Sequence, residues 1–327
     1  MTVEPEFSAS VARPKKRMMS VEWEMCPVTH MKKRPIVSIN FSSLELLQTC
    51  KRKAKYVLRD ELKSNEESPA LSFGSGIHKG LEVWYTLPRE QRKSSCNEDC
   101  TERCANCSAV AAFLRCTEAS TAPVGDKRHP LNGARILRAY FAKFFDDPFE
   151  VMLGADGLPL VEKSFEFTMV DEPHVKINYF GTVDAILKNT ETGVVLVTDH
   201  KTTSSLGSEF YNRIKPNHQY TGYIMGAREA LGIDTELFLV NGLQVAKTKA
   251  ECARQITTRT KEDCDELVSA VRFAVTDYLQ CEAQDRWPQN APNPCTMYGG
   301  CQFRDVCSAP AVLRPQILQN LYGAKAV

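Results

Sequence analysis

The stretch that decides the fold is "GTVDAILKNTETGVVLVTDHKTT", residues 181–203. Two apolar runs flank the polar segment "KNTETG", an order typical of two strands joined by a turn into a hairpin. The second run leads directly into Asp199, His200 and Lys201, although charged residues are rare inside a buried strand. Because side chains alternate along a strand, we expect Asp199 and Lys201 to share one face and His200 to point to the other.

A second acid, Asp184, lies near the end of the first strand of this hairpin, where its carboxylate can come beside that of Asp199. Two carboxylates next to a lysine suit a hard divalent cation such as Mg²⁺ or Mn²⁺, which binds oxygen ligands. Such an ion can activate a water and stabilise charge on a phosphodiester. Lys201 can orient the nucleophile or neutralise the developing charge.

The surrounding sequence predicts an α/β fold. Near the N-terminus, residues 38–58 open a helix in which Ser42 and Glu45 have the spacing of a capping box. A Gly-rich turn is expected to lead into another helix around His78. Strand-like segments occupy 160–170, 175–187, 193–203, 235–246 and 252–260, and helical periodicity marks 131–145, 217–232 and 261–282. Helices before and after the strands favour one mixed sheet flanked by helices.

Composition limits the class of protein. The 327 residues are 43% hydrophobic and 25% charged with a net charge of +1, as in ordinary globular proteins. No apolar run reaches the roughly 18 residues of a membrane span, so no membrane contact is expected. The N-terminus has no apolar core of a secretory signal, which favours the cytoplasm, or the host cytoplasm if the source is viral. Basic clusters in the first sixty residues can meet phosphates, or can be a solvated tail and helix face.

Four short motifs occur in order along the chain: "GSGIHKGLE", "GTVDAIL", "VTDHKTT" and "HQYTGY". They resemble the motifs of PD-(D/E)XK nucleases of the RecB type, a group that includes the nuclease domains of RecB and AddB and CRISPR-associated RecB-like exonucleases. The resemblance covers roughly residues 37–308 and implies a restriction-endonuclease-like core. Residue by residue, His78 matches a histidine that adds a metal ligand, Asp184 the aspartate of a G-x-x-D motif, and Asp199 with Lys201 the D-x-K pair.

The resemblance also extends to a helix after the hairpin. Gln219 and Tyr220 match a Q-x-x-x-Y-type helix that approaches the site and the DNA, and Tyr223 fits the spaced form of that motif. Ordinary packing is the alternative role for all three residues. Glu82, on the helical face of His78, and Glu162, at the start of the first strand, are candidates for groups that support the ligands from outside.

Thirteen cysteines without a secretory signal favour metal ligation over disulfides. In the AddB-like and CRISPR-associated proteins, one early and three late cysteines ligate a [4Fe–4S] cluster, and the resemblance implies this role for Cys50, Cys295, Cys301 and Cys307. The late trio reads C-x₅-C-x₅-C, which departs from the family spacing C-x₂-C-x₅-C. Four-cysteine zinc and unligated buried thiols are the alternatives.

A second group of cysteines lies in a polar stretch, residues 94–128, that is expected to be an insertion. Its cysteines are either ligands of zinc or of a second cluster, or spare thiols: Cys96, Cys100, Cys104 and Cys107. The domain organisation expected from these features is a flexible basic arm over 1–36, a RecB-type nuclease domain with a cysteine staple over 37–310, and a tail over 311–327.

The expected function is a Mg²⁺- or Mn²⁺-dependent DNA exonuclease acting on single-stranded DNA or free ends. Recombination, repair or phage DNA processing is its expected setting, with a recombination or helicase protein as a candidate partner. The rival functions are a catalytically silent DNA-binding module and a zinc-stabilised interaction module on the same fold.

Overall fold

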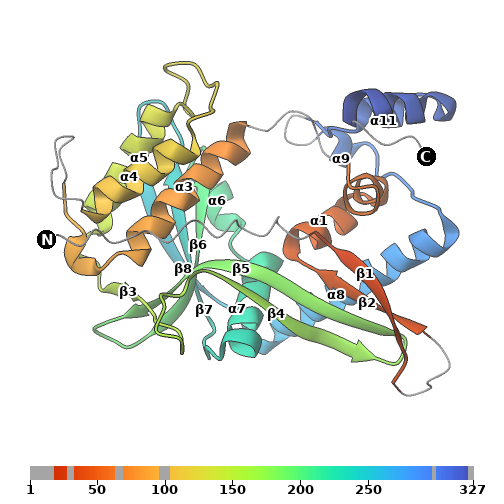
Figure 1. The fold of residues 1–327 in the computed structure, drawn as a ribbon, viewed down its shortest axis with the longest axis horizontal. Coiled ribbons are helices and arrows are strands. Elements are labelled where there is room, and N and C mark those ends of the chain that lie inside the picture. Colours follow the sequence, from red (N-terminus) through yellow and green to blue (C-terminus); the bar gives the residue numbers. More distant parts are fainter. Residues whose placement is uncertain (1–17, 28–32, 63–68, 96–103, 297–299, 323–327) are drawn as a thin grey trace, which may run out of the picture.

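A computed structural model of the chain describes residues 18–27, 33–62, 69–95, 104–296 and 300–322. In this described part, eight strands form one mixed sheet in the order β1-β2-β5-β6-β7-β8, and both β3 and β4 pair with β5 (Figure 1). The β2–β5 and β6–β7 pairs are parallel and the other pairs are antiparallel. The strands are β1 (Ser20–Met25), β2 (Lys33–Ile39), β3 (Phe149–Val151), β4 (Val161–Glu172), β5 (Val175–Asn189), β6 (Val195–Thr203), β7 (Leu237–Gln244) and β8 (Cys252–Thr258).

Helices cover both faces of this sheet (Figure 1). One face carries α1 (Phe41–Thr49), α7 (His218–Leu231) and α8 (Lys261–Gln284); the other carries α3 (Pro69–Thr86), α4 (Ala105–Cys116) and α5 (Pro130–Phe144). The remaining elements are α2 (Lys51–Ala54), η1 (Lys55–Arg59), η2 (Arg89–Gln91), α6 (Ser208–Asn212), α9 (Asn293–Thr296), α10 (Arg304–Ser308), η4 (Ala311–Leu313) and α11 (Arg314–Tyr322). The predicted α/β class with a central mixed sheet is confirmed. Among the described residues, no helix is long and apolar enough to cross a membrane.

The central strands are apolar on both sides because each face packs against a helical layer. Leu196 and Leu239 join the core under α3, α4 and α5, whereas their neighbours Val197 and Val240 join the core under α1, α7 and α8. This explains why β6 begins with a continuous apolar run that ends at Val197, two residues before Asp199.

The predicted hairpin of β5 and β6 is confirmed. The side chain of Asn189 accepts the backbone N–H groups of Glu191 and Thr192, both at 2.9 Å. Gly193 has φ +74°, a left-handed conformation that glycine adopts without steric cost. The turn therefore fixes the register in which β6 returns along β5.

Helix ends follow the expected chemistry in two places and differ in one. Helix α7 ends at Gly232 in a left-handed conformation, as predicted, and α8 begins with a capping box of Thr260 and Asp263. The predicted capping box at residues 42–45 is wrong, because α1 begins earlier. Asn40 caps this helix through a 2.9 Å bond from the backbone N–H of Ser43.

The Gly-rich turn expected before His78 is wrong, since these glycines lie inside the continuous helix α3. They permit close approach to the helices packed beside it. A Cβ at Gly76 would lie 3.0 Å from the Phe113 ring, and one at Gly80 would lie 2.8 Å from Leu137 Cδ1. Close helix packing, and not turn geometry, accounts for Gly76 and Gly80.

Three expectations about irregular segments also need correction where the structure describes them. The arm expected over 1–36 includes β1 and the start of β2, which pair antiparallel at the sheet edge; residues 1–17 lie outside the described part. The insertion expected over 94–128 contains α4, whose Ala109 and Phe113 are buried in the core. The tail expected over 311–327 contains α11, which packs through Tyr322 on Phe303. Each of these segments carries only a short apolar pattern. Such a pattern is difficult to recognise in the sequence before the packing partner is known.

Candidate active site

The two predicted aspartates share one face of the β5–β6 hairpin. Regular pairing ends at Ala185 and Thr198, and the next position in the same register sets Asp184 beside Asp199. Both aspartates are almost fully buried. On the same edge of β5, β2 pairs with residues 176–179 and β6 with residues 185–188. Asp184 therefore lies where these two neighbouring strands separate.

His78 reaches this point from α3, as predicted. Its Nδ1 lies 3.3 Å from Oδ2 of Asp184. Burial alone would lower the pKa of His78, but the carboxylate of Asp184 raises it to about 9. In turn, burial would raise the pKa of Asp184, and the nearby His78 holds it below its usual range. Without a metal, the two residues therefore form an ion pair at neutral pH.

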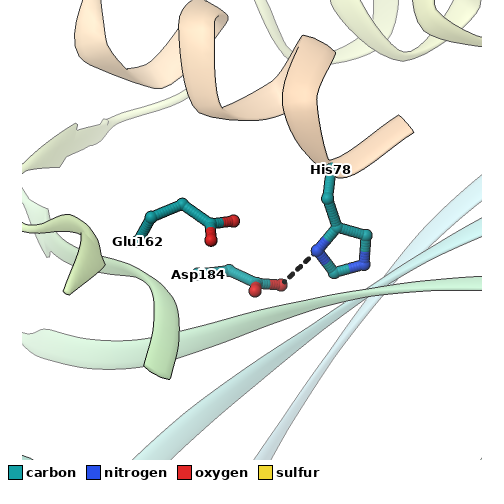
Figure 2. A group of neighbouring side chains, drawn as sticks. All are labelled: His78, Glu162 and Asp184. Carbon is teal, nitrogen blue, oxygen red and sulfur yellow. Dashed lines mark ion pairs between the residues drawn. The ribbon is translucent and has the colours of Figure 1, made fainter. Parts of the chain in front are cut away.

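Glu162 is the third group at this point. One ligand atom each from His78, Glu162 and Asp184 lies within 4.8 Å of the others, and Figure 2 shows the three side chains pointing toward one another. Glu162 occupies the β4 position opposite Asp184, between the pairs Val161–Ala185 and Lys163–Val183. Its φ is +48°, unusual for a residue other than glycine and a feature that often marks functional sites.

Lys201 completes the site from β6. Its Nζ lies 2.7 Å from Oδ2 of Asp199, and its ammonium group lies 5.9 Å from the centre of the Tyr220 ring. Burial, together with the charge of Asp184, raises the pKa of Asp199, although Lys201 opposes this shift. Oδ2 of Asp199 is buried and has no hydrogen bond of good geometry within the described residues. Its negative charge is therefore stabilised mainly by the ammonium group of Lys201.

The donor set fits a hard divalent cation. Carboxylates and one imidazole are ligands that Mg²⁺ and Mn²⁺ accept, and Asp199 beside them has a buried oxygen without a hydrogen bond of good geometry. Within the described ranges, this is the one place where three His, Cys, Asp or Glu side chains come so close.

Comparison with known proteins identifies the family. Residues 38–308 match the family described as the PD-(D/E)XK nuclease superfamily. The chain belongs to the PD-(D/E)XK nuclease superfamily. A search of curated proteins gives no match. Among solved structures, a "putative exonuclease" from Eubacterium rectale is 13% identical with a TM-score of 0.49, covering 83% of this chain and 88% of that one. The protein SSO0001 is 12% identical with a TM-score of 0.33, covering 74% and 95%.

Superfamily membership supports a nuclease, and PD-(D/E)XK nucleases generally use Mg²⁺ or Mn²⁺, in agreement with the donor set. The sequence had suggested Glu162 and Glu82 as outer groups. Glu162 instead lies among the ligand atoms, whereas Glu82 pairs with Lys79 at 2.8 Å. The sequence placed Glu162 at the start of a strand. It could not show that Glu162 lies opposite Asp184, because that depends on the β4–β5 register.

In this PD-(D/E)XK chain, one of the three predicted residues of α7 packs in the core and the other two are partly exposed. Tyr220 is 3% exposed and stacks on Phe238 with ring centres 4.4 Å apart, which indicates a packing role. Gln219 donates from Nε2 to the hydroxyl of Tyr223 at 3.1 Å. Burial, followed by the charges of Asp199 and then Asp184, raises the pKa of Tyr223 well above its usual value, so its hydroxyl lies within range of the site.

The structure brings the expected cysteine ligands into one region. Cys50 lies in extended backbone between α1 and α2, and Cys301 donates its backbone N–H to the carbonyl of Cys295 at 3.0 Å. Burial raises the pKa of Cys307, and negative charge on nearby Cys301 and Cys50 raises it further, while Arg52 opposes the shift through a hydrogen bond and its charge. The early cysteine is thus near the late ones.

The second cysteine group is only partly visible. Cys96 and Cys100 lie outside the described residues. Cys104 is buried at the N-cap position of α4, and Cys107 follows it within the helix.

The basic residues after Cys50 face acids of the same chain. Lys51 pairs with Asp277 at 2.8 Å, and Arg59 pairs with Glu282 at 3.0 Å and Asp285 at 2.7 Å. Phosphate contact by this basic segment remains a prediction, and these two residues would have to exchange their present acidic partners for it. Their charges are matched by α8 and the segment that follows it.

Proposed function

We propose that this chain is a Mg²⁺- or Mn²⁺-dependent exonuclease that hydrolyses phosphodiester bonds at DNA ends. The observation that carries the proposal is the convergence of His78, Glu162 and Asp184, with the Asp199–Lys201 pair alongside. These side chains come from α3, β4, β5 and β6, and together they supply the chemistry that phosphodiester hydrolysis requires.

The proposed roles follow from position. His78, Glu162, Asp184 and Asp199 would hold the ion, which when bound would supply an activated water and neutralise charge on the phosphodiester. Lys201 is fixed by Asp199 on one side and by the Tyr220 ring on the other, so its ammonium is oriented in advance of substrate binding. It would orient the attacking water or stabilise the negative charge of the transition state.

The finer assignment rests on the motif resemblance. We assign Gln219 and Tyr223 to contact with the substrate, because they lie beside the site on the partly exposed side of α7. A RecB-type domain over 37–310, action on single strands or free ends, a cytoplasmic location, a setting in recombination, repair or phage DNA processing, and a helicase or recombination partner all remain predictions.

Degradation of labelled DNA in Mn²⁺ tests the proposal. Wild type should shorten end-labelled linear DNA and leave a closed circular single strand intact, and comparison of single-stranded with duplex substrates gives the strand preference. Asp199→Ala and Lys201→Ala should each lose activity, whereas His174→Ala, at an exposed histidine remote from these residues in the sheet, should not. Equal degradation by wild type and Asp199→Ala, or by neither, refutes the enzyme; DNA binding without cleavage supports the silent binding module.

We also propose that Cys50, Cys295, Cys301 and Cys307 hold a [4Fe–4S] cluster with a structural role. The closeness of Cys50, Cys301 and Cys307 supports this, and four thiolates are the ligands such a cluster takes. When bound, the cluster would join the first helix to the C-terminal segment. Anaerobically purified protein should be brown and contain iron, and Cys307→Ser should lose both properties. A colourless protein with stoichiometric zinc would instead support the zinc-stabilised module.

A further inference from the structure

Behind the candidate active site lies a buried polar row that the mechanism does not use. His200 on β6, Asn241 on β7 and Arg254 on β8 occupy directly opposed positions on three neighbouring strands. Nδ1 of His200 lies 3.1 Å from Nδ2 of Asn241, and Oδ1 of Asn241 accepts a 2.7 Å bond from Nε of Arg254. Asn241 is fully buried, and His200 is 3% exposed.

The far end of this row is firmly anchored. Arg254 forms an ion pair with Asp147 and donates to the hydroxyls of Tyr85 at 3.0 Å and Tyr140 at 3.1 Å. Its guanidinium also lies over the Phe144 ring, 3.8 Å from the ring centre. A guanidinium held by this many partners has one available orientation, so the atom it presents to Asn241 is fixed.

The near end of the row touches the proposed metal ligands. The backbone N–H of His200 donates to Oδ2 of Asp184 at 2.6 Å. The His200 ring packs edge-on against the His78 ring with centres 5.9 Å apart, and Tyr85 stacks on its other side at 5.5 Å. His200 therefore contacts His78 through its ring and Asp184 through its backbone, so a shift of this residue reaches both proposed ligands.

The chemistry of the row determines the tautomer of His200. Arg254 can only donate, so the amide oxygen of Asn241 must face it and the amide nitrogen must face His200. An amide nitrogen only donates, so Nδ1 of the neutral ring must accept and the ring proton must be on Nε2.

We propose that Arg254, acting through Asn241, is a positioning residue for the metal site, because it fixes the tautomer and orientation of His200 against His78 and Asp184. This inference rests on the proposed metal-dependent function. Side chains that orient metal ligands from outside typically change metal affinity by about 10–100-fold when altered.

Asn241→Asp is the variant that separates positioning from charge. The new carboxylate still accepts from Arg254 but offers no N–H to His200, so the ring proton must move to Nδ1. By charge alone, an added carboxylate near the site would strengthen Mn²⁺ binding. We expect the opposite, a roughly tenfold or greater loss of Mn²⁺ affinity by calorimetry without DNA, together with a change of the His200 tautomer in nitrogen-15 imidazole spectra. Spectra of His200→Asn assign the signal.

Gln244→Glu provides the matched control. It makes the same amide-to-acid change on the same strand, but its side chain bonds to the carbonyl of Ser204, outside the row. It should keep wild-type Mn²⁺ affinity and tautomer. If Asn241→Asp does not fold, as judged by circular dichroism, the positioning role is tested by Mn²⁺ binding to Arg254→Lys. A lysine keeps the charge but cannot make the fixed set of bonds, so Mn²⁺ affinity should fall in this variant as well.

The outcomes separate this inference from the proposed function. The positioning role is overturned if folded Asn241→Asp binds Mn²⁺ as tightly as wild type or more tightly. If Asn241→Asp does not fold, the same result in Arg254→Lys overturns it. An unchanged His200 tautomer also overturns it. Failure of wild type to bind Mn²⁺ at all would instead remove the metal-dependent function itself.

Discussion

The backbone N–H of His200 donates a 2.6 Å hydrogen bond to the carboxylate of Asp184. This bond lies just beyond the point where the regular β5–β6 pairing ends at Ala185 and Thr198. It ties one aspartate of the site to the residue that follows the other, Asp199. The end of the β5–β6 pairing and the candidate metal site therefore meet at this bond.

Asp184→Asn tests this contact against the proposed ligand role. The amide oxygen can still accept from His200, so we expect the fold to survive, while the loss of charge removes a metal ligand. Mn²⁺ affinity should fall by more than the roughly 10–100-fold typical of an outer supporting group, and nuclease activity should fall with it. Glu191→Gln, in the β5–β6 turn, is the control and should behave like wild type. Full activity in Asp184→Asn would contradict the ligand role.

The raised pKa of His78 predicts a pH dependence of metal binding. Its pKa is about 9, so the metal-free protein carries a proton there at neutral pH, and a bound metal requires the neutral ring. Binding must release this proton. Mn²⁺ affinity should therefore rise by about tenfold per pH unit up to pH 9 and then level off. Calorimetry in buffers of different ionisation enthalpy should show close to one proton released, and less in His78→Ala. A flat pH profile below 9 would contradict either the raised pKa of His78 or its role as a metal ligand.

The sequence predicted Asp184, Asp199 and Lys201 correctly as neighbours because their arrangement depends on local rules, namely strand alternation and a polar turn. Glu162 could not be assigned in the same way, since its position depends on how β4 pairs with β5 and on a left-handed backbone at one residue. Arg254 was missed for a similar reason. Its partners come from α3, α5, β7 and the link before β3, and only the assembled sheet brings them together.

Two glycines of α3 should respond in opposite ways to alanine. A Cβ at Gly80 would lie 2.8 Å from Leu137 Cδ1 and 3.2 Å from the carbonyl oxygen of Ala109, so Gly80→Ala should destabilise by about 1–3 kcal/mol. At Gly74 the nearest atom is 3.6 Å away, so Gly74→Ala should stabilise by about 0.5–1 kcal/mol through helix propensity. Urea unfolding measures both values. A destabilising Gly74→Ala, or a neutral Gly80→Ala, would be inconsistent with the packing of α3 described above.

Salt dependence of DNA binding tests whether the basic helix contacts phosphates. Arg59 is already paired with Glu282 and Asp285, so Arg59→Gln should leave the slope of log affinity against log salt unchanged. Lys201 is also paired, with Asp199, but its proposed role places the ammonium at the substrate phosphate, so Lys201→Gln should reduce that slope by about one. Both measurements are made in chelator to prevent cleavage. A reduced slope for Arg59→Gln would instead show that Arg59 contacts a DNA phosphate.

Tyr220 and Lys201 form the last testable pair, because the ring centre of Tyr220 lies 5.9 Å from the lysine ammonium. If the tyrosine acts through its ring, Tyr220→Phe should keep nuclease activity within about twofold, since phenylalanine keeps both the stacking on Phe238 and the attraction to a cation. Tyr220→Leu keeps the burial but lacks the ring, and should lower the catalytic rate through a less ordered Lys201. Lys201→Ala should cost about 100–1,000-fold, the range found when a group that stabilises transition-state charge is removed. A large loss in Tyr220→Phe would instead assign a direct role to the hydroxyl. Equal activity in the leucine and phenylalanine variants would show that the ring does not orient the lysine.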